Sequence, residues 1–215
     1  MSIFDTLSAY GVVPVIAIDD AADAIPLADA LIKGGLPVAE ITFRTTAARD
    51  AIAAIASERP EVQIGAGTVI TNAQVDDAKS AGAQFCLSPG IDVEVLAHAA
   101  SVGMPFAPGI MTPTELQAAL KMGCKMVKFF PAKPAGGPNM LKNIASPYVH
   151  TGIGFNPTGG VNMDNLADWL ALPEVRAVGG TWIATRADIA AGNWDKIATN
   201  AAAAVARVRQ IRAAA

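Results

Sequence analysis

A lysine interrupts an apolar run near the middle of the chain, Met126-Val127-Lys128-Phe129-Phe130-Pro131. If this run is a strand, alternation places Lys128 on one face with Met126 and Phe130, and the other two side chains on the opposite face. Burial of an amine favours its neutral form, and a neutral amine attacks a ketone to give an imine. The alternative is a lysine whose stem covers apolar surface while its charge reaches solvent. Because the other lysines fall in expected helices or loops, Lys128 is the best candidate nucleophile.

A polar stripe occupies a second apolar run, Val38-Ala39-Glu40-Ile41-Thr42-Phe43-Arg44. Strand alternation places Glu40, Thr42 and Arg44 on one face and the apolar side chains on the other. A carboxylate there can act as general acid or base, and a guanidinium can clamp a substrate carboxylate with its planar fork. The alternative is a buried structural ion pair.

Two glycine pairs follow the last two expected strands, in Pro157-Thr158-Gly159-Gly160 and Val178-Gly179-Gly180-Thr181. A single pair is usually a turn, but in barrel enzymes the loops after these strands often bind phosphate through backbone N–H groups. Thr68 and Thr158 are candidates to hydrogen-bond a carboxylate or ketone, or to cap the helix that follows.

The elements that must position these residues alternate between short apolar runs and Ala-rich segments of helical length, with a repeat of roughly 20 to 25 residues. The expected strands are Val12–Ile18, Val38–Phe43, Gln63–Gly67, Gln84–Leu87, Met104–Ala107, Met126–Phe129, Gly154–Thr158 and Val175–Gly179. The expected helices are Ser2–Tyr10, Ala22–Lys33, Thr46–Ser57, Asn72–Ala81, Val93–Ser101, Pro113–Met122, Met163–Ala171 and Trp194–Ala213.

Eight such repeats predict an α/β fold, a (β/α)8 TIM barrel with an additional N-terminal helix, formed as a single domain by residues 1–215. Glycines are expected to end several helices with positive φ, namely Gly34, Gly82, Gly103 and Gly123. A doubly wound open sheet is the alternative. It would carry a Gly-rich phosphate fingerprint after the first strand, and Val15-Ile16-Ala17-Ile18-Asp19-Asp20 contains no glycine.

The composition limits the partners. Hydrophobic residues make up 52% of the 215 residues, charged residues 16%, and the formal net charge is -3, which favours a compact chain without a nucleic-acid or membrane surface. No signal segment or membrane span is recognisable, so we expect a cytoplasmic protein. Cys86, Cys124, His98 and His150 are isolated from one another, which predicts reduced thiols, no metal site and no cofactor.

These residues in this order resemble the 2-keto-3-deoxy-6-phosphogluconate (KDPG) and 4-hydroxy-2-oxoglutarate (KHG) aldolases, which are class I pyruvate aldolases. The resemblance covers nearly the whole chain. It is carried by Val12–Val15, Glu40–Thr45, Gly65–Val69, Ser88–Gly90, Pro108–Gly109, Lys128–Ala132, Pro157–Gly160 and Gly179–Trp182.

The resemblance implies a Schiff-base lysine, Lys128, with Glu40 as general acid/base, cleaving a phosphorylated keto acid to pyruvate and glyceraldehyde 3-phosphate. It further implies a homotrimer. The implied contacts to the pyruvate portion are Arg44, Thr68, Pro89, Phe130 and Thr158, and the implied phosphate contacts are Gly159, Gly160, Gly180 and Thr181. Thr181 stands where the resemblance leads us to expect serine, which also offers a hydroxyl.

Three alternatives remain from the sequence. The substrate is either the gluconate or the galactonate epimer, since no residue can be tied to the hydroxyl that differs. A phosphosugar epimerase or isomerase would use Glu40 as base while Lys128 only neutralises charge. A non-catalytic barrel that binds a phosphorylated ligand would leave the polar stripe on Glu40, Thr42 and Arg44 unexplained.

Overall fold

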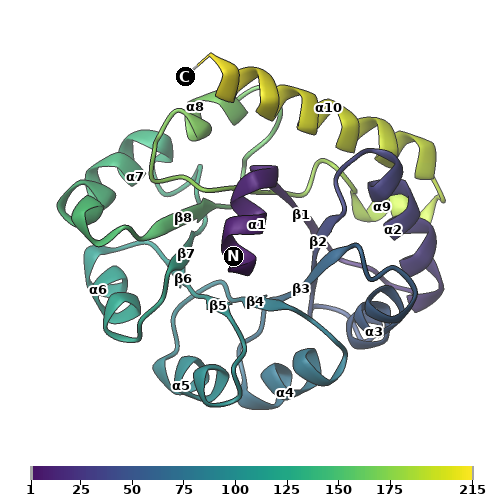
Figure 1. Ribbon diagram of the computed structural model, residues 1–215, viewed down its shortest axis with the longest axis horizontal. Helices are drawn as coiled ribbons and strands as arrows, with labels where there is room; N and C mark the ends of the chain where they lie inside the picture. The colour runs from purple at the N-terminus through teal and green to yellow at the C-terminus, as the bar shows by residue number, and fades with distance from the viewer. Residues whose placement is uncertain (1, 215) are drawn as a thin grey trace.

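The computed structural model describes residues 2–214, so positions 1 and 215 of the expected domain lie outside the described residues. Helices and parallel strands alternate along the chain (Figure 1). In order, the elements are α1 (Ile3–Tyr10), β1 (Val12–Ile16), the 3-10 helix η1 (Ala21–Asp23), α2 (Ala24–Lys33), β2 (Val38–Thr42), α3 (Ala48–Glu58), β3 (Gln63–Gly67), α4 (Asn72–Ser80), β4 (Phe85–Leu87), α5 (Val93–Ser101), β5 (Phe106–Ala107), β6 (Gly109–Ile110), α6 (Pro113–Lys121), β7 (Met126–Phe129), α7 (Gly137–Ala145), the 3-10 helix η2 (Ser146–Thr151), β8 (Gly154–Pro157), α8 (Leu166–Leu170), β9 (Val178–Gly180), α9 (Arg186–Ala190) and α10 (Trp194–Ala213).

The strands are parallel and form a curled sheet that the helices surround (Figure 1). One hydrogen-bonded group has the order β5-β4-β3-β2-β1-β9, and a second has the order β6-β7-β8. The order follows the sequence, and the last strand lies beside the first. A doubly wound sheet reverses its order at a switch point, so this alternative is wrong.

The two groups of strands approach each other at two places. Isolated bridges join Phe155 to Val175 and Thr158 to Gly179, which links β8 and the residue after it to β9 and the segment before it. At the other place, β5 and β6 are separated by Pro108, which has no N–H to donate and interrupts the ladder. The carbonyl of Pro108 still accepts a hydrogen bond from the backbone of Lys128 at 2.8 Å.

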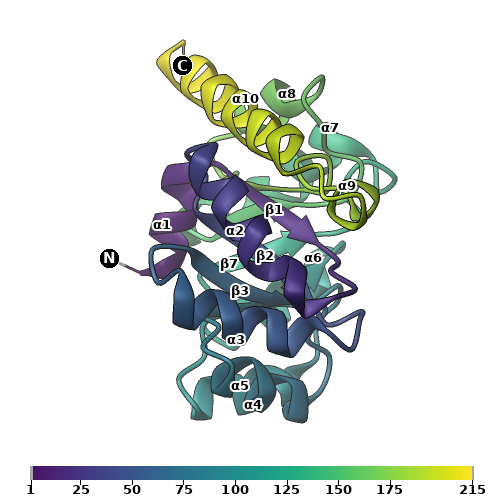
Figure 2. The ribbon, with the colours of Figure 1, turned by 90° about the vertical axis from the view of Figure 1, so that its right-hand side faces the viewer.

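The sheet is buried on both faces. Val127 and Phe129 on β7 are fully buried, and the ring of Phe129 packs against Trp169 of α8 with 6.4 Å between centroids. The expected orientation of this strand, with Phe129 toward the helices, is therefore confirmed. Helix α1 lies over the end of the sheet where the strands begin (Figures 1 and 2), which leaves the carboxyl ends of the strands open for a site.

Each of the eight expected strands overlaps an observed one, although several boundaries differ. The fifth expected strand ends too early, because β6 resumes after Pro108, and the eighth begins too early. Helices α7 and α9 were not expected: α7 begins within a Pro- and Gly-rich stretch, and α9 is only five residues long.

The helix ends agree with the glycine prediction at three of four positions. Gly82, Gly103 and Gly123 have positive φ, whereas Gly34 has φ −77° and the left-handed position falls on Gly35, at φ 72°. Gly34 does end α2 as its C-cap residue, but the expected positive φ was wrong there, because the left-handed residue comes one position later in the Gly-Gly pair. No helix within residues 2–214 has the length and apolar character needed to cross a membrane.

Candidate active site

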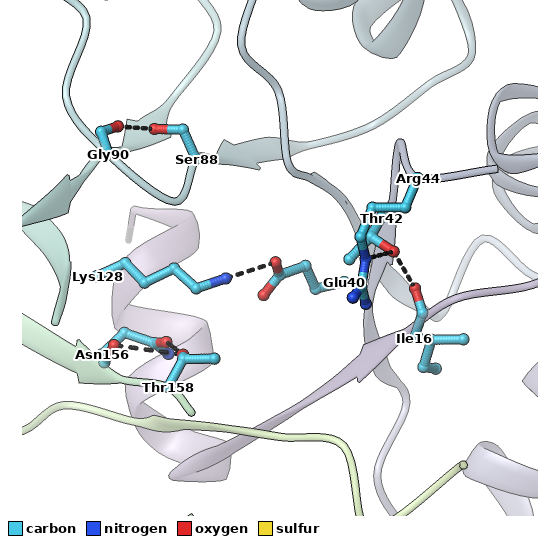
Figure 3. Close-up of polar contacts among 9 residues, drawn as sticks. All are labelled: Ile16, Glu40, Thr42, Arg44, Ser88, Gly90, Lys128, Asn156 and Thr158. Atoms are coloured by element: carbon cyan, nitrogen blue, oxygen red, sulfur yellow. Dashed lines mark hydrogen bonds and ion pairs between the residues drawn. The ribbon is translucent and has the colours of Figure 1, made fainter. Parts of the chain in front are cut away.

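A buried ion pair lies inside the curled sheet. Lys128 on β7 donates from Nζ to Oε1 of Glu40 on β2 at 2.9 Å, across the interior of the sheet (Figure 3). The exposed fraction is 5% for Lys128 and 0% for Glu40. Burying two charges is costly unless they pair well, so each of these two groups needs the other.

Glycine on the neighbouring strand makes room for Glu40. A Cβ placed on Gly67 would lie 2.2 Å from Glu40 Oε1, so any side chain there would displace the carboxylate from Lys128. The second carboxylate oxygen, Glu40 Oε2, is buried and accepts no hydrogen bond from the part of the chain that the structure describes. Glu40 therefore holds the amine with one oxygen and keeps acceptor capacity on the other.

Arg44 is oriented by a short hydrogen-bonded chain that begins on β1. Thr42 donates from Oγ1 to the carbonyl of Ile16 at 2.8 Å, and Arg44 donates from Nε to Thr42 Oγ1 at 3.0 Å (Figure 3). None of the ion pairs within residues 2–214 includes Arg44. Its terminal nitrogens are thus available to a ligand anion, the use to which a guanidinium fork is best suited.

A cavity of about 230 Å³ opens at the carboxyl ends of the strands, beside the ion pair. Cations, hydroxyls, glycines and apolar surface all contribute to it. Its lining comprises Val15, Thr42, Arg44, Thr68, Pro89, Lys128, Phe130, Thr158, Gly159, Gly160, Val161, Gly179 and Thr181.

Thr68 enters this cavity from a strained backbone. Its φ is +57°, and it is the non-glycine residue with positive φ within residues 2–214. A β-branched residue rarely adopts this conformation, and such strain persists where the surroundings or the function require it. Helix α4 is capped by Thr71, whose side chain accepts from Gln74 N, so Thr68 does not serve as the helix cap.

The apolar part of the lining is fixed by close backbone contacts. Ser88 donates from Oγ to the carbonyl of Gly90 at 2.5 Å, which closes the turn that presents Pro89. A Cβ on Gly109 would lie 2.1 Å from the Pro89 carbonyl oxygen, so this approach requires glycine. Phe130 adds an aromatic ring to the lining, with Lys128 Nζ 5.9 Å from its ring centroid.

The glycine pair after β8 adopts backbone conformations that other residues rarely enter. Gly159 has φ +102° and Gly160 has φ +78°. Both line the cavity together with Thr181 from the loop after β9. Backbone N–H groups exposed in this way, without side chains, suit an anion such as phosphate.

Comparison with known proteins identifies the family. The family model described as KDPG and KHG aldolase matches residues 3–200. The chain belongs to this family.

Individual members of the KDPG and KHG aldolase family are similar over nearly the full length. The chain is 46% identical to the 2-dehydro-3-deoxy-phosphogluconate aldolase of Treponema pallidum, with 92% of this chain and 93% of that protein covered. It is 43% identical to the KHG/KDPG aldolase of Escherichia coli K12, with 93% and 92% covered. A crystal structure of the Legionella pneumophila KDPG aldolase, with pyruvate captured as a covalent carbinolamine, superposes with a TM-score of 0.90 at 41% identity, covering 94% of this chain and 98% of that one.

Most of the residues that sequence reasoning selected meet in this one place. Glu40 lies behind the cavity in contact with Lys128. The predicted residues that line the cavity are Arg44, Thr68, Pro89, Lys128, Phe130, Thr158, Gly159, Gly160 and Thr181. Gly180 is not in the lining. A Cβ there would lie 1.9 Å from the Trp182 ring, so this glycine makes room for a packed indole. Its role in phosphate binding stays a prediction.

Several residues of the site were not predicted from the sequence. Val15 and Val161 line the cavity without having been selected, and Gly179, which also lines it, was named only as part of a glycine pair. Gly67 and Asn156 shape the cavity from behind. Alternation would have found two of them, since Gly67 lies two residues after Gly65 on one face of β3, and Asn156 is a polar residue within a buried strand.

The cysteines do not compete with Lys128 as nucleophiles. Burial raises the pKa of Cys86 to about 12 and that of Cys124 to about 11, so both thiols stay protonated at neutral pH. Neither belongs to the cavity lining. Residues 2–214 contain no group of three or more His, Cys, Asp or Glu side chains placed to hold a metal ion.

Proposed function

We propose that the protein is a class I, Schiff-base aldolase that cleaves 2-dehydro-3-deoxy-6-phosphogluconate to pyruvate and glyceraldehyde 3-phosphate. The observation that carries the proposal is the 2.9 Å contact between Lys128 Nζ and Glu40 Oε1 at the wall of a cavity that also receives Arg44. An amine and a proton-accepting carboxylate in contact are the two groups that imine formation and retro-aldol cleavage require.

The substrate binds by its two anionic ends. Arg44 holds the carboxylate beside the C2 ketone, with the Thr68 hydroxyl as a further donor, and Pro89 and Phe130 pack against the short carbon chain. The phosphate at the other end lies against the backbone of Gly159 and Gly160 and the hydroxyl of Thr181. Gly180 belongs to the same loop. Two anchored ends hold the C2 ketone at Lys128 and the C4 hydroxyl within reach of Glu40.

Catalysis then follows from one proton that moves between the two buried groups. Glu40 takes a proton from the Lys128 ammonium, and the neutral amine attacks C2 to give a carbinolamine. Loss of water, with Glu40 returning the proton to the departing hydroxyl, gives the iminium. Glu40 next takes the proton of the C4 hydroxyl as the C3–C4 electrons move into the iminium, which releases glyceraldehyde 3-phosphate. The enamine is protonated at C3, and water hydrolyses the iminium to pyruvate and Lys128.

The same site accounts for a second substrate. Cleavage of 4-hydroxy-2-oxoglutarate to pyruvate and glyoxylate needs the carboxylate clamp, the amine and the acid/base group, and needs no phosphate contact. The galactonate epimer of the phosphorylated substrate is the alternative main substrate. Side-by-side kcat/KM values for the two epimers and for 4-hydroxy-2-oxoglutarate decide between these three.

Reductive trapping tests the proposal against the phosphosugar epimerase that would use Glu40 as base. Pyruvate and borohydride give a stable adduct on Lys128, located by peptide mass spectrometry, and Lys128→Met abolishes both the adduct and the turnover. The matched control is Lys125→Met, which removes an exposed lysine three residues earlier and keeps both. The absence of any adduct on Lys128 would refute the Schiff-base mechanism, and conversion of a phosphosugar without release of pyruvate would favour the epimerase.

We also propose that residues 1–215 form one closed (β/α)8 barrel domain, with β5 and β6 as a single strand broken at Pro108, and that it assembles as a homotrimer. One continuous cluster of buried apolar residues supports a single domain. The exposed side chains of Ile70, Val93 and Met111, at 53%, 50% and 42%, follow successive strands and suit burial between subunits. Light scattering on the purified protein tests the trimer. The cytoplasmic location stays a prediction.

A further inference from the structure

An asparagine lies inside the curled sheet, among side chains that are either apolar or already have a role in the proposed reaction. Asn156 is on β8, in register with Lys128 on β7, so the two side chains leave neighbouring strands at the same level. Its exposed fraction is 1%. Burying an amide is unfavourable unless its polar atoms find partners, so the contacts of Asn156 indicate what the residue does.

The partner of Asn156 is the hydroxyl that lines the cavity. Thr158 donates from Oγ1 to Asn156 Oδ1 at 2.8 Å, with a longer contact of 3.5 Å to the Asn156 carbonyl (Figure 3). A Cβ on Gly179 would lie 2.2 Å from Thr158 Oγ1, so the hydroxyl is enclosed between the amide and a bare glycine. Its rotation is therefore restricted on two sides.

A threonine hydroxyl has one hydrogen and two lone pairs. Because the hydrogen is given to Asn156, only acceptor capacity remains toward the cavity. An acceptor repels a substrate carboxylate or ketone oxygen and binds a substrate hydroxyl. This changes the role that sequence reasoning gave to Thr158, which was to donate to the pyruvate portion.

We propose that Asn156 is a positioning residue for the aldolase reaction, which fixes Thr158 as a hydrogen-bond acceptor for a hydroxyl group of the substrate. The inference rests on the proposed function and adds a specificity element to it. Substrates that carry a hydroxyl on the chain gain this contact, whereas pyruvate, which has none, does not. Asn156 itself does not touch the substrate and acts through Thr158.

The test is a double-mutant cycle with Asn156→Leu, which keeps the size of the side chain, and Thr158→Val. Each single variant lowers kcat/KM for 2-dehydro-3-deoxy-6-phosphogluconate by about tenfold, the usual value of one hydrogen bond, and the double variant falls no further than the lower single variant. Borohydride trapping with pyruvate proceeds in Asn156→Leu at the wild-type rate. A merely structural role would impair both reactions together.

Two outcomes overturn the inference without touching the proposed function. One is an unchanged kcat/KM in Asn156→Leu, and the other is a loss that adds fully to that of Thr158→Val. A wild-type protein that forms no pyruvate adduct would instead refute the proposed function. If Asn156→Leu fails to fold in a thermal denaturation control, Asn156→Ala replaces it, because the smaller side chain adds no bulk inside the curled sheet and the same expectations apply.

Discussion

Two walls face each other across the reactive amine, and they are built in opposite ways. On the β2 wall, Glu40 and Arg44 carry charge, and a threonine between them holds the guanidinium. On the β8 wall, the groups are neutral: Asn156, Thr158 and the backbone of two glycines. In the proposed mechanism, the β2 wall supplies proton transfer and anion attraction, whereas the β8 wall supplies shape and hydrogen-bond direction. The proposed mechanism thus separates the chemistry and the choice of substrate onto different strands.

The difference also affects how each wall tolerates change. Glu40 is the proposed proton acceptor and Arg44 the proposed anion clamp, so substitutions on the β2 wall should have the larger effects on kcat or KM. Neutral hydrogen bonds contribute up to about 1.5 kcal/mol each, so substitutions on the β8 wall should cost up to about tenfold. Three substitutions compare the two walls by the size of their effect on kinetics. An acid titration examines a cluster around Asp188, which lies in neither wall.

The largest effect is expected at Glu40. Glu40→Gln keeps the size of the side chain but removes the proton acceptor, and kcat should fall by roughly 10² to 10⁴-fold, the usual contribution of general acid/base catalysis. Steady-state kinetics measure it, with Glu61→Gln, an exposed glutamate, as the control that keeps full activity. A loss below tenfold would mean that the two walls do not differ in the way described.

Arg44→Lys should come second. Lysine keeps the charge but loses the planar fork and the Nε donor that Thr42 accepts, so KM should rise by about 10 to 100-fold with kcat less affected. The control is Arg49→Lys, because Arg49 is half exposed and pairs with carboxylates on the surface. If kcat instead fell by this factor while KM stayed unchanged, Arg44 would contribute to the chemical step and not to substrate binding.

Gly160→Ala probes the β8 wall. The residue has φ +78°, and an added Cβ would lie 2.6 Å from Lys133 Cβ, so the loop must shift and weaken its phosphate contacts. We expect kcat/KM to fall by about tenfold for the phosphorylated substrate and little for 4-hydroxy-2-oxoglutarate, which has no phosphate.

Gly152→Ala is the matched control for that substitution. Gly152 has a similar φ of +72° and no heavy atom within 4 Å of an added Cβ, so it reports backbone strain alone. Equal losses on both substrates in Gly160→Ala would contradict a phosphate role for this loop.

The two walls were also unequally predictable from the sequence. Glu40, Thr42 and Arg44 form a polar stripe at every second position of an apolar run, and strand alternation alone assigns their face. Lys128 was visible for the same reason. Such residues can be selected from the sequence alone, because a charge inside a buried strand has few explanations apart from function.

The β8 wall gave a weaker signal. Asn156 is polar but uncharged, and its importance lies in a hydrogen bond to a residue two positions later that only the folded structure brings into view. Gly67 was visible as a glycine, but the carboxylate it makes room for comes from another strand. The repeat of strands and helices predicted the order of the sheet. The break at Pro108 was not predicted, because it depends on whether the neighbouring strand needs a hydrogen bond from that backbone position, which the sequence alone does not show.

The smallest effect on activity is expected for a cluster outside both walls. Asp188 on α9 accepts hydrogen bonds from Lys196 at 2.8 Å, Thr185 at 2.7 Å and Asn193 at 3.1 Å, and these contacts, with Lys196 first, lower the pKa of Asp188 to about 2. The unfolded chain binds this proton near pH 4. The contribution of Asp188 to stability is therefore complete above about pH 4 and is lost as the pH falls toward 2.

Asp188→Asn should accordingly be less stable than the natural chain at neutral pH, and the two midpoints of thermal unfolding should converge as the pH approaches 2. Asp164→Asn, at an exposed position, serves as the control and should follow the natural chain throughout. Because Asp188 ties α9 to α10 and lies in neither wall, kcat at neutral pH should not change. A fall in kcat together with unchanged stability would mean that this cluster acts on the loop that carries Thr181, and the separation of chemistry from scaffold would then be narrower than the two walls suggest.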